Sequence, residues 1–216
     1  MNDIVIYGFG GFGREVACLL KILNEKTPTW NLIGYIDDGV AAGAENRYGK
    51  VLGGIEYLNN YASPLSVVIS IANPKVLRGI VAKLHNPLLN FPNIIAPNVN
   101  VFDKDAFSIG KGNIVFWGCR LSCDVRIGDF NLINGAVSLG HDVTLHNFNV
   151  LGPSTRLSGS CCVGDENQFG VGSIVLQGIK IGNNTKIGIG SVVIRNTADD
   201  AFYFGNPAKN VKEEFK

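Results

Sequence analysis

The chain has 216 residues, and the 46% of them that are apolar can bury a substantial core in one large domain or two small ones. Its 19 Lys and Arg residues nearly balance 18 Asp and Glu residues, and a net charge of +1 without a basic run disfavours nucleic acid as a partner. We expect a cytoplasmic protein, because the sequence shows no signal peptide, no apolar run near the ~20 residues of a membrane span, and five cysteines without disulfide-framework spacing.

The first part of the chain alternates apolar strands with amphipathic helices. Strands are predicted at residues 3–7, 31–36 and 66–72, and helices at residues 14–26 and 74–85. Such alternation is typical of an α/β unit with a short parallel sheet. We therefore expect a small Rossmann-like domain over residues 1–92, which is too short for a complete dinucleotide-binding fold.

A glycine-rich turn joins the first predicted strand to the first predicted helix. Gly8, Gly10 and Gly13 form a GxGxxG pattern in this turn. Asp37 and Asp38 follow the second predicted strand, where an acidic residue can contact a ribose. Backbone amides at the start of a helix can hold a pyrophosphate. The pattern is compatible with a nucleotide-sugar site, with an NAD site, or with a tight turn that has only a structural role.

The second part of the chain repeats with a period of six residues. Every sixth residue is apolar at fifteen successive positions, which are Ile109, Val115, Leu121, Ile127, Ile133, Leu139, Leu145, Leu151, Leu157, Val163, Phe169, Val175, Ile181, Ile187 and Val193. The next residue is often glycine, as at Gly110, Gly128, Gly140, Gly152, Gly164, Gly170, Gly182 and Gly188. Small or short polar residues recur two positions before the apolar one, among them Cys119, Thr155, Cys161, Ser173, Thr185 and Ser191. This pattern is typical of hexapeptide repeats.

Each hexapeptide is expected to form one short strand and one corner, so that three hexapeptides complete a triangular coil of eighteen residues. The apolar and small residues point into the prism, and glycine supplies the backbone conformations that corners need. Fifteen hexapeptides make five coils and predict a left-handed parallel β-helix over residues 93–200, with a register break at 103–105 and a capping tail at 201–216. Because Cys119 and Cys161 fall at inward positions, we expect them to be structural and not metal ligands.

Several segments together resemble one family of bacterial enzymes. They are GFGGFGREV at residues 8–16, LIGYIDD at 32–38, VLGGIEYL at 51–58, the hexapeptide array, and FGNPAK at 204–209. In these segments the chain is similar to nucleotide-sugar acetyltransferases of the sialic acid O-acetyltransferase type, which include enzymes that N-acetylate UDP-4-amino sugars. The resemblance implies a homotrimer with active sites between adjacent β-helices, a nucleotide sugar held by the N-terminal domain, and acetyl-CoA in the groove between prisms.

The resemblance also implies candidate site residues. His141 matches the general base, Asp142 the residue that orients it, and Asn134 a positioning residue. The implied nucleotide-sugar site comprises Gly8, Gly10, Gly11, Phe12, Asp37 and Asp38, and the implied acetyl-CoA site comprises Asn149, Gly170, Gly188, Gly205, Asn206, Pro207 and Ala208. Many family members have a histidine where this chain has Phe12 or Val150, so some contacts to the acceptor and the donor differ here.

The residues themselves also favour His141 as the base. An ammonium or alcohol must lose a proton before it attacks a thioester, and histidine titrates near neutral pH. His141 follows the inward Leu139 by two residues, which places it near a corner, and Asp142 can fix the imidazole orientation. Gly159 lies one coil further along, so its backbone N–H is predicted to bind the developing oxyanion. The alternative is a solvated corner histidine without a catalytic role.

Two other functions are compatible with such a prism. A zinc carbonic anhydrase needs three histidines from neighbouring prism faces, but the chain contains only His85, His141 and His146, so no metal is expected. A non-enzymatic trimeric sensor or scaffold would bind a nucleotide sugar but not acetyl-CoA. We therefore predict an acetyl-CoA-dependent N- or O-acetyltransferase that acts on a nucleotide-linked amino sugar, of the UDP type, in glycan or polysaccharide biosynthesis.

Overall fold

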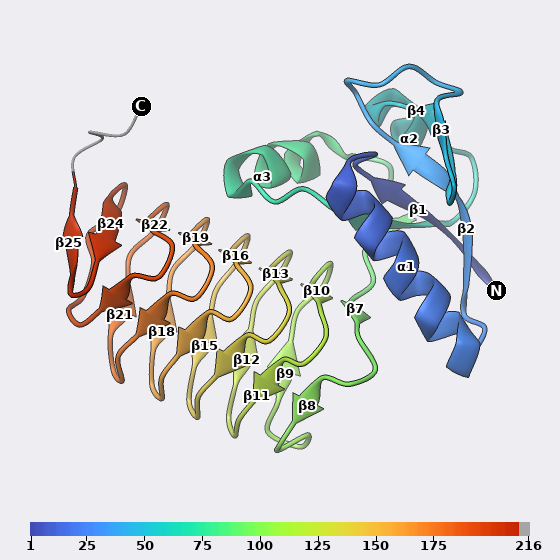
Figure 1. Cartoon of the computed structure of the whole chain (residues 1–216). Coiled ribbons are helices and arrows are strands. Elements are labelled where there is room, and N and C mark those ends of the chain that lie inside the picture. Colours follow the sequence, from blue (N-terminus) through green and yellow to red (C-terminus); the bar gives the residue numbers. More distant parts are fainter. Residues whose placement is uncertain (212–216) are drawn as a thin grey trace. The chain divides into compact units, whose positions relative to one another are not determined.

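The computed structural model describes residues 1–211, which form two compact units (Figure 1). The first unit spans Met1–Ile94, and the second begins at Ile95. Within the described part of the chain, no helix is both long enough and apolar enough to cross a membrane.

The first unit is a six-stranded sheet with three helices. Its strands are β1 (Asn2–Tyr7), β2 (Trp30–Ile36), β3 (Glu45–Asn46), β4 (Gly49–Gly53), β5 (Leu65–Ile69) and β6 (Leu89–Asn90), and its helices are α1 (Gly11–Lys26), α2 (Ile55–Asn59) and α3 (Pro74–Lys83). The strands lie in the order β3-β4-β2-β1-β5-β6, and every pair is parallel except the β3–β4 hairpin. The predicted α/β fold of this region is confirmed, although the β3–β4 hairpin, α2 and β6 were not predicted.

Local sequence explains how the longer helices of this unit begin. α1 starts inside the glycine-rich turn, where Gly13 is required because a Cβ at this position would lie 2.0 Å from the carbonyl oxygen of Gly8. α3 starts at Pro74, whose fixed φ suits the first position of a helix. The side chain of Asn73 caps α3 by accepting a hydrogen bond from the Val76 N–H at 3.2 Å.

The second unit is a prism with three faces, each a sheet of short parallel strands (Figure 1). Face 1 contains β7 (Ile94–Ile95), β10 (Ile114–Val115), β13 (Leu132–Ile133), β16 (Val150–Leu151), β19 (Gln168–Phe169), β22 (Lys186–Ile187) and β24 (Phe202–Gly205). Face 2 contains β8 (Asn100–Val101), β11 (Arg120–Leu121), β14 (Ser138–Leu139), β17 (Arg156–Leu157), β20 (Ile174–Val175) and β23 (Val192–Val193). Face 3 contains β9 (Ser108–Ile109), β12 (Arg126–Ile127), β15 (Thr144–Leu145), β18 (Cys162–Val163) and β21 (Lys180–Ile181). A last strand, β25 (Ala208–Asn210), pairs antiparallel with β24.

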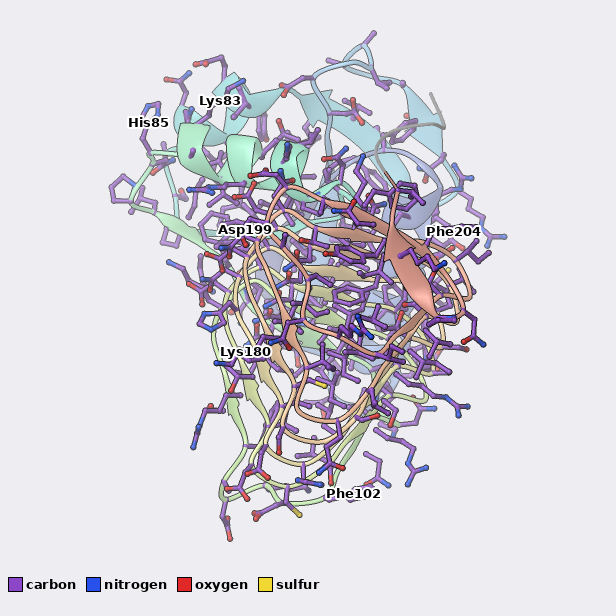
Figure 2. The ribbon with its side chains drawn as sticks, turned by 90° about the vertical axis from the view of Figure 1, so that its left-hand side faces the viewer. Lys83, His85, Phe102, Lys180, Asp199 and Phe204 are labelled. Carbon is purple, nitrogen blue, oxygen red and sulfur yellow. The ribbon has the colours of Figure 1, made fainter. Side chains whose placement is uncertain are left out.

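The chain visits faces 1, 2 and 3 in turn, which gives the prism a 1–2, a 2–3 and a 3–1 corner along its length. Figure 2 looks along the prism, and Phe204, Phe102 and Asp199 lie near these three corners in that order. Neighbouring strands of one face are eighteen residues apart, as in the pairing of Leu121 with Leu139. The coil of three hexapeptides predicted from the sequence is therefore confirmed.

The prism begins two strands before the first predicted hexapeptide, because β7 and β8 already pair with β10 and β11. β8 begins at Asn100 and β9 at Ser108, so this step is two residues longer than the six-residue repeat. The extra residues fall at the predicted register break, residues 103–105. The predicted apolar column fills the prism, and its members from Val115 to Val193 are at most 4% exposed.

The glycines that follow the apolar column have a different role from the one predicted. Gly140 does not adopt a positive φ, but a Cβ at this position would lie 2.6 Å from the backbone nitrogen of Gly159 in the next coil. The left-handed conformation occurs two residues later, for example at Asp142 with φ of +59°. Glycine is therefore needed in this column because successive coils pack closely, and not because the corner requires left-handed backbone.

A ladder of buried asparagines runs along the 3–1 corner. Asn113, Asn131, Asn149 and Asn167 are at most 1% exposed. Each Oδ1 accepts the backbone N–H of the residue one coil further along, at 2.7–2.9 Å. The ladder thus satisfies buried backbone donors and links five successive coils to one another.

Candidate active site

His141 and Asp142 form a hydrogen-bonded pair at the 2–3 corner, between β14 and β15. The Nδ1 atom of His141 lies 2.7 Å from Oδ2 of Asp142, and the two side chains are 54% and 59% exposed. Because the carboxylate accepts from Nδ1–H, the other ring nitrogen, Nε2, carries the lone pair and is free to take a proton. The pair therefore has the geometry of an exposed general base with an orienting carboxylate.

Gly159 lies directly beside the imidazole of His141, in the next coil. A Cβ at Gly159 would be 2.4 Å from Nε2 of His141, so the ring covers this glycine. The flanking Ser158 and Ser160 donate backbone hydrogen bonds to Val175 and His141, at 3.0 and 2.7 Å. Within residues 1–211, the N–H of Gly159 has no hydrogen-bond partner. A base and an unused backbone donor are thus brought together at one corner, as an acyl transfer requires.

Asn134 lies at a different corner of the same coil. It follows β13, at the 1–2 corner, whereas His141 lies at the 2–3 corner. The side chain is half-buried, the N–H donates to the Leu151 carbonyl at 3.1 Å, and the carbonyl accepts from the Cys119 thiol at 3.1 Å. A single chain therefore does not bring Asn134 and His141 together.

In the first unit, the predicted nucleotide-sugar residues gather at the carboxyl ends of β1 and β2. Gly8, with φ of +112°, leads into a turn in which Gly10 precedes α1 and Gly11 begins it. Asp37 accepts the Phe9 N–H on Oδ2 at 2.9 Å and the Gly39 N–H on Oδ1 at 2.9 Å. Phe12 lies half-buried in the first turn of α1. Ligands of open parallel sheets bind at this end of the strands, so the placement suits a nucleotide.

Asp38 is held by two groups that the sequence analysis did not predict. Its Oδ2 accepts the hydroxyl of Tyr7, and its Oδ1 accepts the Ile55 N–H at 2.7 Å. Burial and the neighbouring Asp38 raise the pKa of Tyr7, so this hydroxyl stays protonated. Ser70 also supports the turn, because its hydroxyl donates to the carbonyls of Tyr7 and Gly8 at 2.8 and 3.2 Å. Tyr7 ends an apolar run and Ser70 stands alone, so the only sequence signal was their position at strand ends.

The structure contradicts the assignment of the Asn149 side chain to the acetyl-CoA site. Asn149 is 0% exposed and belongs to the asparagine ladder inside the prism, so its side chain cannot reach a ligand on the surface. The sequence contained the signal, because Asn149 stands two residues before Leu151 and therefore in the inward column.

The other predicted acetyl-CoA residues lie along the 1–2 corner and at the end of face 1. A Cβ at Gly170 would be 2.5 Å from the Ile189 nitrogen, and one at Gly188 would be 2.1 Å from the Phe204 ring, so both glycines are required by packing. The residues Gly205, Asn206, Pro207 and Ala208 form the turn between β24 and β25, with a cis bond between Asn206 and Pro207.

The remaining histidine of the prism lies apart from His141. His146 is at the 3–1 corner, where its Nε2 atom is 4.0 Å from the thiol of Cys162. Among residues 1–211, no three His, Cys, Asp or Glu side chains gather in a group that could hold a metal ion.

Comparisons with known proteins agree with this architecture. The PglD N-terminal domain family matches residues 3–84. A variant of perosamine N-acetyltransferase from Caulobacter crescentus with one histidine replaced by asparagine, solved with CoA and GDP-perosamine, is 26% identical, with a TM-score of 0.88 over 98% of both chains. The acetyltransferase domain of PglB from Neisseria gonorrhoeae is also 26% identical, with a TM-score of 0.88 over 98% of this chain and 100% of that domain. No curated protein sequence matches the chain.

WeeI from Acinetobacter baumannii, at 24% identity, shares the fold with a TM-score of 0.86 over 98% of this chain and 100% of that one. The predicted fold class, an α/β domain followed by a left-handed parallel β-helix, is confirmed. Residues 3–84 therefore match the PglD N-terminal domain family, and the chain as a whole has the architecture of the hexapeptide-repeat nucleotide-sugar acetyltransferases that its sequence resembles.

Proposed function

We propose that this chain transfers the acetyl group of acetyl-CoA to the amino group of a nucleotide-linked amino sugar. The observation that carries the proposal is the His141–Asp142 pair, which presents a free imidazole nitrogen beside the unused N–H of Gly159. The similar perosamine N-acetyltransferase was solved with CoA and GDP-perosamine, and the similar PglB domain was solved with acetyl coenzyme A. Both the donor and the class of acceptor therefore have a precedent on this architecture.

In the proposed reaction, Nε2 of His141 removes a proton from the sugar amine as the amine attacks the thioester carbonyl. The carbonyl oxygen becomes negatively charged, and the N–H of Gly159 stabilises it. Collapse of the tetrahedral intermediate breaks the carbon–sulfur bond and releases CoA. The protonated His141 returns its proton to the departing sulfur, and Asp142 stabilises the imidazolium between the two transfers.

We propose that the active unit is a homotrimer. Because Asn134 and His141 lie at different corners of one coil, a positioning role for Asn134 requires the 1–2 corner of one prism to meet the 2–3 corner of another. The last two coils also expose an apolar patch on face 2 and its two corners, made of Val171 (47%), Ile174 (37%), Leu176 (51%), Ile189 (65%) and Ile194 (41%). Contiguous exposed apolar surface of this kind is typical of a subunit interface.

A direct assay tests the proposed function. Purified protein would be mixed with acetyl-CoA and each of a panel of UDP- and GDP-linked amino sugars, and release of the CoA thiol would be followed. We expect turnover with at least one of them and an amide product one acetyl group heavier. The matching nucleotide sugars with a hydroxyl in place of the amine test O-acetylation. Calorimetric binding of a nucleotide sugar without any binding of acetyl-CoA would contradict the proposal and favour a sensor.

The reactants also indicate where the reaction takes place and which unit of the chain binds each of them. Acetyl-CoA and nucleotide sugars are cytoplasmic metabolites, so we place the reaction in the cytoplasm. We assign the nucleotide to the carboxyl ends of β1 and β2, where Asp37 and Asp38 flank the glycine turn. We assign acetyl-CoA to the surface of the prism, with the turn from Gly205 to Ala208 at the end of its path.

A further inference from the structure

Two adjacent carboxylates, Asp37 and Asp38, connect the segments that border the carboxyl ends of β1 and β2. Asp37 holds the glycine turn through the Phe9 N–H and the following loop through the Gly39 N–H, both at 2.9 Å. Asp38 holds the first residue of α2 through the Ile55 N–H at 2.7 Å. Each carboxylate oxygen thus accepts one hydrogen bond from the protein and has a second lone pair that can accept a hydrogen bond from a ligand.

The hydroxyl of Tyr7 orients the second of these carboxylates, that of Asp38. Tyr7 ends β1, is 3% exposed, and donates to Oδ2 of Asp38. The backbone of the same residue is fixed as well, because the Tyr7 carbonyl accepts from both the Ser70 N–H and the Ser70 hydroxyl at 2.8 Å. The donor is therefore rigid, whereas Asp38 itself lies in an exposed loop after β2 and has no comparable support.

We infer that Tyr7 is a positioning residue for the nucleotide-sugar site, and that it acts through Asp38 on the segment at the start of α2. The inference rests on the proposed function for the identity of the ligand. Without the hydroxyl, the Asp38 carboxylate can rotate, and the Ile55 N–H loses its fixed acceptor. The nucleotide sugar then binds to a less ordered segment at the start of α2. Ordering this segment on binding costs free energy, which lowers the affinity without changing the chemistry at His141.

The raised pKa of Tyr7 is consistent with this role. Burial contributes most to the shift, followed by the hydrogen bond to Asp38. Because burial and this hydrogen bond hold the proton on the Tyr7 hydroxyl, the hydroxyl remains a donor to Asp38.

The test is the Tyr7→Phe variant, which keeps the buried ring and removes only the hydroxyl. We expect KM for the nucleotide sugar to rise about tenfold, the scale of one lost hydrogen bond to a charged group. Both kcat and KM for acetyl-CoA should stay within about twofold of the parent protein. The matched control is Tyr48→Phe, because Tyr48 is a half-buried tyrosine of the same unit whose hydroxyl contacts Cys18 and Arg47 instead of the site.

A melting temperature that falls in Tyr7→Phe with an unchanged KM for the nucleotide sugar would overturn the inference, because the hydroxyl would then serve only folding. Calorimetry separates this failure from failure of the proposed function. Titration of the parent, Tyr7→Phe and Tyr48→Phe with the UDP- and GDP-sugars requires no turnover, and a loss of affinity confined to Tyr7→Phe supports the inference even if no acetyl transfer occurs. Equal affinity in all three proteins would contradict it.

Discussion

The imidazole of His141 lies against Gly159 so closely that a Cβ on the glycine would be 2.4 Å from Nε2. The two residues lie in adjacent coils, which are joined here by the hydrogen bond from the Ser160 N–H to the His141 carbonyl at 2.7 Å. The absence of a side chain at residue 159 therefore creates the space in which the proposed base sits. It also leaves beside that base the buried Gly159 N–H, which has no hydrogen-bond partner among residues 1–211.

We predict that Gly159→Ala reduces kcat by about 10- to 100-fold, because the new methyl group displaces the His141 ring from its place beside the proposed oxyanion donor. Gly159 does not adopt a positive φ, and the atoms it would meet belong to the end of an exposed side chain, so the melting temperature should change little. Steady-state kinetics and thermal denaturation measure the two effects. The control is Gly79→Ala in α3, where a Cβ meets nothing within 4 Å. Full activity in Gly159→Ala would exclude this glycine from the reaction centre.

The proposed base is tested by His141→Ala, which we expect to lower kcat at least ~100-fold while KM values change little. His146→Ala provides the matched control, since His146 is also exposed but lies at the 3–1 corner. Equal kcat values in the two variants would contradict the assignment of His141. The kcat of the Asp142→Asn variant should lie between those of His141→Ala and His146→Ala, because an amide still accepts from Nδ1 but does not stabilise the imidazolium.

The repeat made the prism predictable from the sequence, because a period of six states directly which residues point inward and which positions lie one coil apart. That arithmetic placed Gly159 beside His141 without further information. The pairing of Tyr7 with Asp38 could not be predicted in this way. It depends on the parallel register of β1 and β2, which pairs Tyr7 with Ile36, and on the direction of a side chain beyond the strand end.

The predicted roles of Asn149 and of the repeat glycines differ from the structure for the same physical reason. The resemblance assigned Asn149 to acetyl-CoA, although the inward column of the repeat already contained it. The repeat glycines were explained by backbone freedom, but the distance from Gly140 to the next coil shows that they allow close packing. A repeat specifies positions along the chain, whereas the reason for a particular residue type depends on distances between coils.

We predict that Asn149→Ala destabilises the protein by about 2–4 kcal/mol, because it takes a hydrogen bond from a buried partner on each side of the ladder. These partners are the Asn167 N–H, which donates to Asn149 Oδ1 at 2.9 Å, and Asn131 Oδ1, which accepts from Asn149 Nδ2 at 3.1 Å. Denaturant unfolding measures the loss, with exposed Asn31→Ala as the control. KM for acetyl-CoA should be unchanged in folded Asn149→Ala. A raised KM with normal stability would restore Asn149 to the acetyl-CoA site.

The proposed trimer is tested at the apolar patch. Ile189 is its most exposed member at 65%, so Ile189→Asp should place a charge in the proposed interface and convert the trimer to monomers. Light scattering coupled to size exclusion measures the mass, and acetyl transfer should fall in parallel if neighbouring chains complete the site. Val76→Asp in α3, at a side chain 50% exposed, is the matched control. A parent protein that is monomeric and active at assay concentration would refute the assembly.

Stability above pH 9 should depend on Cys119, which is 0% exposed and donates its thiol proton to the Asn134 carbonyl at 3.1 Å. Burial raises the pKa of this thiol from 9.0 to about 11. Below pH 9 the thiol is protonated in both the folded and the unfolded chain. Between pH 9 and about 11 the unfolded chain releases this proton and the folded one retains it, so the free energy of unfolding falls as pH rises.

Two pKa units correspond to about 2–3 kcal/mol, which is an upper bound for the loss. The measurement is urea unfolding from pH 8 to 11 for the parent and for Cys119→Ala, because every other titrating group is common to both proteins. The variant should be less stable at pH 8, since a cavity replaces the sulfur. The difference in the free energy of unfolding between the parent and the variant should narrow as pH rises toward 11. A difference that stays constant across this range would show that the thiol ionises alike in the folded and unfolded chains.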